Sequence, residues 1–126
     1  MKKHIHIGMD VGASAVKCIV LDTGGKILWR QYIHHDCRVV ETVERVMTDL
    51  VAAYEGNEVF LCMTGQGGED IAERFGVPFI PEIAAQSDYL SHFGGDVDAV
   101  IEIGGESAKI TYLHPVVDQR VNRICA

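Results

Sequence analysis

Apolar and polar residues alternate at the start of the chain, which predicts a strand over residues 4–9 with one apolar face. An unbroken apolar run predicts a second strand over residues 16–22, buried on both faces. After the turn at Thr23, Gly24 and Gly25, residues 26–34 predict a third strand. Three strands joined by tight turns indicate an antiparallel meander.

The apolar spacing changes to three and four residues from about residue 36, which predicts an amphipathic helix that ends at Gly56 and Asn57. Residues 58–63 predict a fourth strand, and this strand should be parallel to an earlier one because a helix connects them. A short helix over residues 69–75 and an extended segment over residues 77–80 follow.

A helix over residues 82–93 is followed by Gly94 and Gly95, which break the chain. Residues 98–103 and 108–113 predict two further strands, and residues 116–121 a third. We therefore predict an α/β fold with a mixed sheet flanked by helices. Its first domain covers residues 1–95, including the connecting helix, and residues 96–126 form the truncated start of a second, similar domain.

The turn between the first two strands carries candidate phosphate-binding chemistry. Asp10 ends an apolar strand, and Gly12, Ser14 and Lys17 follow in a tight connection. A glycine lets backbone N–H groups approach an oxyanion, Ser14 adds a hydroxyl donor, Asp10 suits a hydrated Mg²⁺, and Lys17 offsets phosphate charge. An ordinary turn is the alternative, because Asp and Gly are common in turns for local reasons.

A second copy of this pattern favours the phosphate-binding interpretation. The stretch IEIGGESAK repeats the order of acid, apolar residue, glycine and lysine, and each residue lies 92 positions after its counterpart. The pairs are Asp10 with Glu102, Gly12 with Gly104, Ala13 with Gly105, and Lys17 with Lys109. So long an interval indicates two related domains that offer one hairpin each to a shared cleft, rather than a solenoid.

A third glycine-rich turn runs from Thr64 to Gly68, between the fourth strand and the short helix. A turn of this kind at a helix start is a possible anion site, and glycines that merely let the chain turn are an equally good interpretation. The neighbouring histidines His34 and His35 point to opposite faces of the predicted strand, so they cannot easily bind one metal ion together. We assign them no function.

Composition and charge exclude several classes of protein. A net charge of −7 argues against nucleic-acid binding. No apolar run is long enough to span a membrane and the start lacks a signal-peptide core, so the cytoplasm is expected. The four cysteines are scattered without a CxxC pair, which argues against a zinc knuckle and a disulfide framework.

The order of elements with duplicated hairpins is similar to the ribonuclease-H-like pattern of the actin, hexokinase and Hsp70 ATPase superfamily. The motifs IGMDVGASAVKCIVLD, MTGQGG, IAERFGVPFIPEI, AVIEIGGESAKITYL and RVNRICA resemble, in order, the activators of 2-hydroxyacyl-CoA dehydratases and benzoyl-CoA reductases. The likeness is to the amino-terminal part of the long members of that family.

The resemblance implies a homodimeric ATPase that binds ATP or ADP with Mg²⁺, holds one [4Fe-4S] cluster between its subunits, and drives one electron into a partner dehydratase or reductase. Carried over by position, the first phosphate motif is Asp10, Gly12, Ala13, Ser14 and Lys17, and the second is Glu102, Gly104 and Gly105. Cys125 corresponds to the first of two cluster ligands, and the second is expected beyond Ala126.

Two departures from the family pattern leave other functions open. Glu102 stands where shorter relatives usually carry Asp, and Ser107 stands where an acid is common. The alternatives are a small-molecule kinase of the same superfamily and a non-catalytic interaction domain. For the 126-residue chain itself we expect little or no ATPase activity, because the adenosine-binding half is missing, and a tendency to dimerise through unfinished strand edges.

Overall fold

The computed structural model describes residues 2–105 and 107–113. The chain divides into two compact units, Met1–Gln86 and Ser87–Ala126, and the division lies within helix α3 (Glu82–Phe93). The sequence predicted the joint farther along, at Gly94 and Gly95. The domain bounds 1–95 and 96–126 stay a prediction.

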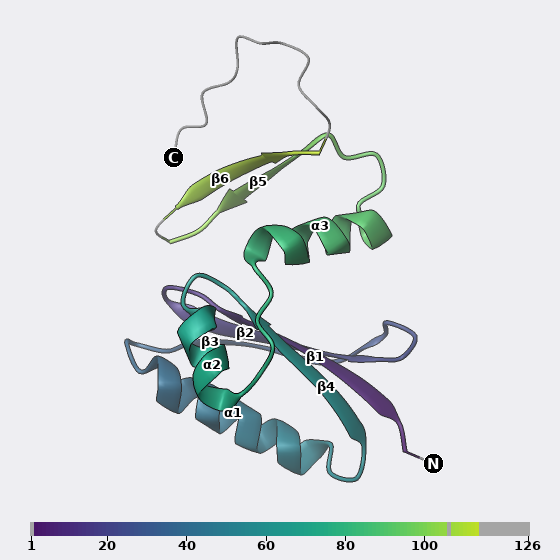
Figure 1. The fold of residues 1–126 in the computed structure, drawn as a ribbon, viewed down its shortest axis with the longest axis vertical. Coiled ribbons are helices and arrows are strands. Elements are labelled where there is room, and N and C mark those ends of the chain that lie inside the picture. Colours follow the sequence, from purple (N-terminus) through teal and green to yellow (C-terminus); the bar gives the residue numbers. More distant parts are fainter. Residues whose placement is uncertain (1, 106, 114–126) are drawn as a thin grey trace. The chain divides into compact units, whose positions relative to one another are not determined.

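A four-stranded mixed sheet forms the centre of the first unit (Figure 1). Its spatial order is β3-β2-β1-β4, in which β1, β2 and β3 form an antiparallel meander. Strand β4 pairs with β1 in parallel, as the helical connection predicted. The strands are β1 (His4–Val11), β2 (Ala15–Asp22), β3 (Ile27–His34) and β4 (Glu58–Thr64).

One face of this sheet is covered by helices α1 (Val39–Ala53) and α2 (Gly68–Phe75). The alternation in β1 determines which side chains lie beneath them, because successive residues point to opposite faces. The core side chains from β1, β2 and the helices are Ile5, Ile7, Met9, Val11, Val16, Cys18, Val20, Val43, Val46, Leu50 and Ala72.

The opposite face of the sheet carries the polar residues of the same strands. Lys17 of β2 is exposed there and Ile19 is half-buried. The prediction that this strand is buried on both faces is therefore wrong. The apolar run is buried on the helix side only.

Helix α1 begins at Val39, after a strained turn. Asp36 and Cys37 both have positive φ, 47° and 63°, and the Arg38 N–H donates to the carbonyl of His35 at 2.7 Å. The helix ends at Ala53, and the carbonyl of its C-cap residue Tyr54 accepts a hydrogen bond from the Asn57 side chain at 3.2 Å. This end agrees with the predicted stop at Gly56 and Asn57.

Strand β4 is the edge of the sheet for most of its length. Only at Met63 does the segment after α2 reach it: the Met63 N–H donates to the Pro78 carbonyl, and the Ile80 N–H donates to the Met63 carbonyl, both at 2.8 Å. Among the described residues, nothing pairs with the outer side of β4 before Met63.

The second unit contains an antiparallel hairpin of β5 (Ala99–Ile103) and β6 (Ala108–Tyr112). Most of its apolar side chains are exposed, with Ile103 82% and Ile101 67% accessible. In the part of the chain that the structure describes, no helix has the length and apolar character needed to cross a membrane.

Candidate phosphate-binding hairpins

The first hairpin brings its acid and its lysine together. Asp10 and Lys17 face each other across β1 and β2, and Lys17 Nζ donates to Asp10 Oδ2 at 3.2 Å. Both side chains reach solvent, 35% exposed for Asp10 and 53% for Lys17, so this ion pair is weak and either group can turn to a ligand.

The second hairpin has the same register as the first. Glu102 lies opposite Lys109, as Asp10 lies opposite Lys17. The Gly12 N–H donates to the Ala15 carbonyl at 2.9 Å, and its counterpart Gly104 donates to Ser107 at 2.8 Å. The repeat read from the sequence is therefore also a repeat of pairing and turn geometry. A shared cleft between the two hairpins stays a prediction.

The donors that face solvent in the first turn are not those of Gly12. The Gly12 N–H is used within the hairpin, whereas Ala13 and Ser14 are exposed and their N–H groups have no acceptor among the described residues. Two successive backbone N–H groups and the Ser14 hydroxyl can together bind an oxyanion. Ala13 and Ser14 are therefore the part of this hairpin that is available to bind an anion.

Residues at the end of β4 lie directly beside Asp10. Thr64 lies beside Asp10 in the parallel register, and its buried Oγ1 has no hydrogen-bond partner among the described residues. Gly65 has a φ of +104°, and a Cβ on it would lie 2.5 Å from Asp10 Oδ1 and closer still to the Val11 carbonyl oxygen. Only glycine leaves room for the Asp10 carboxylate at this position.

The turn from Gly65 to Gly68 holds the end of β1. The Gly67 N–H donates to the Val11 carbonyl at 3.1 Å and the Gly68 N–H to the Gly65 carbonyl at 3.0 Å. Two acids, Glu69 and Asp70, occupy the first turn of α2. The structure therefore favours the packing interpretation of these glycines over an anion site, because the N–H groups of Gly67 and Gly68 are used within the protein and the local charge is negative.

His35 contacts the first hairpin, although we assigned it no function from the sequence. It is buried, 5% exposed; its N–H donates to the Ser14 carbonyl at 3.1 Å, and its Nε2 lies 3.1 Å from the Gly12 carbonyl oxygen. Because a carbonyl only accepts, Nε2 carries the proton. The one available signal was its place at the end of β3, whose register sets His34 opposite Ala15.

We expect His35→Ala to loosen this hairpin, because two backbone carbonyls are tied to this residue and the side-chain bond is lost. The first unit should lose about 1–3 kcal/mol of stability, and the Gly12 amide, which donates to the Ala15 carbonyl at 2.9 Å, should exchange with solvent faster. Hydrogen exchange by NMR measures this. His35→Gln should restore part of the protection, and His34→Ala on the exposed neighbour should change neither quantity. Equal exchange in His35→Ala would show that the hairpin is held without it.

A hollow of about 600 Å³ adjoins Asp10 and Lys17 on the sheet face away from α1. Arg30, Tyr32 and Thr64 are among its lining residues, and Lys17 Nζ lies 5.8 Å from the centre of the Tyr32 ring. The hollow is mostly apolar, with one carboxylate and two cations at its border. It can therefore take a ligand that has both an apolar body and a charged group.

The described cysteines, Cys18, Cys37 and Cys62, are all unpaired thiols. Burial raises the pKa of the Cys18 thiol to about 11 and also raises the pKa of Cys62. No group of three or more His, Cys, Asp or Glu side chains suited to a metal occurs within residues 2–105 and 107–113. Cys125, the expected cluster ligand, lies outside the described residues.

Comparisons with known proteins identify the fold. No family model matches the sequence. A curated relative, the uncharacterized protein MJ0004 of Methanocaldococcus jannaschii, is 26% identical over an alignment of 126 positions that covers 95% of this chain and 49% of that protein. The chain therefore spans about half the length of this relative.

Two solved structures resemble the chain closely in fold. One is component A of the (R)-2-hydroxyglutaryl-CoA dehydratase of Acidaminococcus fermentans, with a TM-score of 0.71 and 23% identity over 88% of this chain and 43% of that one. The other is the activator of the 2-hydroxyisocaproyl-CoA dehydratase of Clostridium difficile with bound ADPNP, with a TM-score of 0.65 and 20% identity over 87% and 41%. The chain has the mixed α/β fold of the actin-like ATPases, as the sequence predicted.

Proposed function

We propose that this chain is the nucleotide-binding part of an ATP-driven, iron–sulfur activator that passes electrons to a 2-hydroxyacyl-CoA dehydratase or a related reductase. The observation that supports it best is the pair of hairpins with the same register of acid, glycine turn and lysine. The fold shared with two dehydratase activators, one of them solved with ADPNP, points the same way.

The residues of the first hairpin fit a nucleotide with Mg²⁺. The half-exposed Asp10 carboxylate offers the oxygen ligands that Mg²⁺ prefers, and the exposed N–H groups of Ala13 and Ser14 suit phosphate oxygens. Lys17 can move from Asp10 to a phosphate, because both lie at the surface. The bound nucleotide would supply a phosphoanhydride whose hydrolysis drives the electron transfer.

The second hairpin carries the equivalent residues for the same class of ligand. Glu102, Gly104 and Gly105 correspond to Asp10, Gly12 and Ala13, and Glu102 is exposed at the end of β5. A glutamate reaches farther than an aspartate, so its cation would lie farther from the strand end. We propose the same ligand class for both hairpins, with Asp10 as the principal cation ligand.

A homodimer would hold the [4Fe-4S] cluster between its subunits through Cys125 and a further cysteine, and a dehydratase or reductase in the cytoplasm would accept the electron. Neither a nucleic acid nor a membrane is part of the proposed function.

Iron analysis tests the electron-transfer part of the proposal. In a polypeptide that continues past Ala126 and is purified anaerobically, we expect iron, sulfide and a cubane EPR signal, and we expect Cys125→Ala to lose all three because a thiolate ligand is gone. Cys37→Ala, on an exposed thiol of the same chain, is the control and should keep the cluster. Absence of a cluster in both the wild type and Cys125→Ala would leave a nucleotide-binding protein without the electron-transfer role.

A non-catalytic nucleotide-binding domain is the second candidate function, and Glu102 with Ser107 favours it. Ser107 uses its carbonyl to close the second turn and brings no charge to the site. Binding of Mg·ATP without turnover would support this candidate, and turnover would exclude it.

A further inference from the structure

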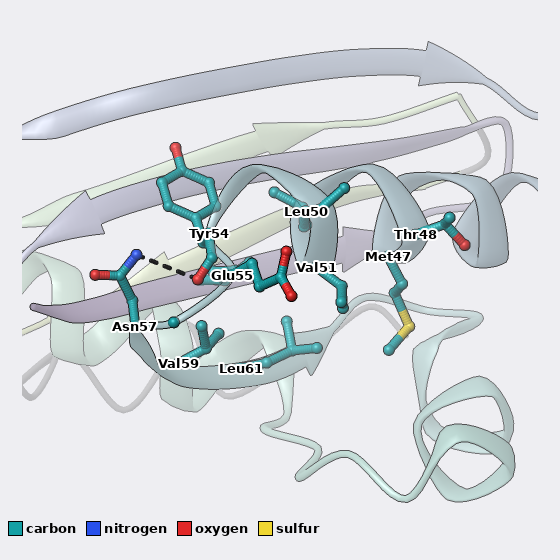
Figure 2. Close-up of a pocket in the computed structure, with 12 residues that line it drawn as sticks. Met47, Thr48, Leu50, Val51, Tyr54, Glu55, Asn57, Val59 and Leu61 are labelled. Atoms are coloured by element: carbon teal, nitrogen blue, oxygen red, sulfur yellow. Dashed lines mark hydrogen bonds between the residues drawn. The ribbon is translucent and has the colours of Figure 1, made fainter. Parts of the chain in front are cut away.

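An apolar groove lies on the other side of the molecule from Lys17, between α1 and the edge of β4. We name it the α1–β4 groove. Its volume is about 560 Å³, and Figure 2 shows Val51, Val59 and Leu61 pointing toward one another across it. Its lining side chains are Ile7, Met47, Leu50, Val51, Tyr54, Val59 and Leu61, with polar residues at the borders.

The exposure of these side chains shows that the groove is open to solvent. Val51 is 70% exposed and Val59 43% exposed, although both carry only hydrocarbon. A second hollow of about 290 Å³ shares Met47 and Val51 with the groove and extends it toward Phe75 of α2. Contiguous apolar surface of this kind is typical of sites that bind another polypeptide.

The main chain beside the groove is ready for pairing. Along a strand the hydrogen-bonding groups point alternately to the two sides, and Met63 uses its outward N–H and C=O with Pro78 and Ile80. Leu61 and Val59 therefore point their N–H and C=O groups outward as well. Among the described residues, nothing pairs with them. The same two residues line the groove with their side chains.

Charge at the two ends of this surface selects the partner. Glu55 borders the α1–β4 groove just after the end of α1. Glu44 borders the second hollow, about three helical turns earlier on α1. No lysine or arginine is among the residues that line either hollow. A partner that covers this surface therefore gains from a positive charge at each end.

We propose that the α1–β4 groove binds an extended polypeptide segment that adds a strand to the outer side of β4. Its apolar side chains lie toward Val59 and Leu61, and a lysine or arginine at each end meets Glu55 and Glu44. Main-chain hydrogen bonds then provide affinity, and the groove and the acids provide specificity, as in other cases of strand addition. This proposal does not depend on nucleotide binding.

The test is an NMR titration of the 126-residue chain with the capped peptide Lys-Thr-Val-Thr-Val-Thr-Lys. This peptide sets its valines and lysines on one face and threonines on the other. We expect shifts of the Val59 and Leu61 amides, about tenfold weaker binding by the peptide with Glu for Lys, and no binding when the valine nitrogens are methylated. Binding of the Glu peptide or of the methylated peptide with equal affinity would overturn the proposal.

Charge variants on α1 make the test specific. Glu44→Lys and Glu55→Lys should each weaken binding of the basic peptide about threefold, and together about tenfold, which is the size of effect expected for exposed ion pairs. Asp49→Lys makes the same charge change on the same helix outside both hollows and should leave the affinity unchanged. An equal loss of affinity with Asp49→Lys would show that the effect comes from the net charge of the chain and not from contacts with Glu44 and Glu55, and would overturn the proposed charge contacts. A dimer whose β4 amides are protected without peptide would identify a second copy as the occupant and overturn the proposal.

Discussion

Replacing Asp10 by asparagine is expected to lower Mg²⁺-dependent ATPase turnover by about 100-fold or more in a chain that spans the length of its relatives. Asparagine keeps the size of the side chain and can still accept from Lys17, but it removes the charge that a cation requires. Asp10 is 35% exposed at the end of β1, so a bound cation can reach it. Turnover at saturating Mg·ATP measures the effect.

The control for this experiment is Asp49→Asn, because Asp49 is an exposed acid on α1. It should retain full turnover. The unfolding temperature of Asp10→Asn should stay close to that of the wild type, because the ion pair with Lys17 is exposed and weak. Unchanged turnover in Asp10→Asn would rule out the proposed role of this carboxylate.

Replacing Gly65 by alanine is expected to destabilise the first unit by about 3–5 kcal/mol. The added Cβ would lie 2.5 Å from Asp10 Oδ1, against the Val11 carbonyl, and in a backbone conformation with φ +104°. The strand end, the turn to α2 and the Asp10 carboxylate must all shift to accept it. Urea unfolding of the 126-residue chain gives the free energy.

Gly56→Ala is the matched control for that substitution. Gly56 also has a positive φ, +81°, but a Cβ there would meet nothing within 4 Å. We expect it to cost only about 1 kcal/mol, the strain of the backbone conformation alone. If Gly65→Ala costs no more than Gly56→Ala, the close approach of Gly65 to Asp10 is not tight enough to require glycine.

Over the described residues, local patterns were sufficient to predict the elements of the fold, and the strand predicted over residues 116–121 lies outside them. The alternation in β1 and the three- and four-residue spacing in α1 place apolar side chains on one face of each element, and this requirement is local. The parallel pairing of β4 followed from its helical connection, because a strand that returns after a crossover runs in the same direction. These predictions agree with the structure.

The candidate site was predicted in part. The repeat placed Asp10 and Glu102 correctly at equivalent hairpin positions, because pairing register follows from the spacing of the turn. It did not show that the Gly12 N–H closes the turn. Nor did it show that Gly65 is required by the Asp10 carboxylate, since these residues are distant in sequence and meet only through the pairing of β1 with β4.

The sequence by itself determined the order of strands and helices, the duplication of the acid–glycine–lysine hairpin, and the α/β class, because each depends on spacing within a short stretch. Tertiary structure alone decided which face of β2 is buried, that His35 ties down the first hairpin, and that β4 leaves its outer main-chain groups unpaired along the α1–β4 groove. These features depend on which segments meet in space, and that choice minimises exposed apolar area over the whole unit rather than within any one element.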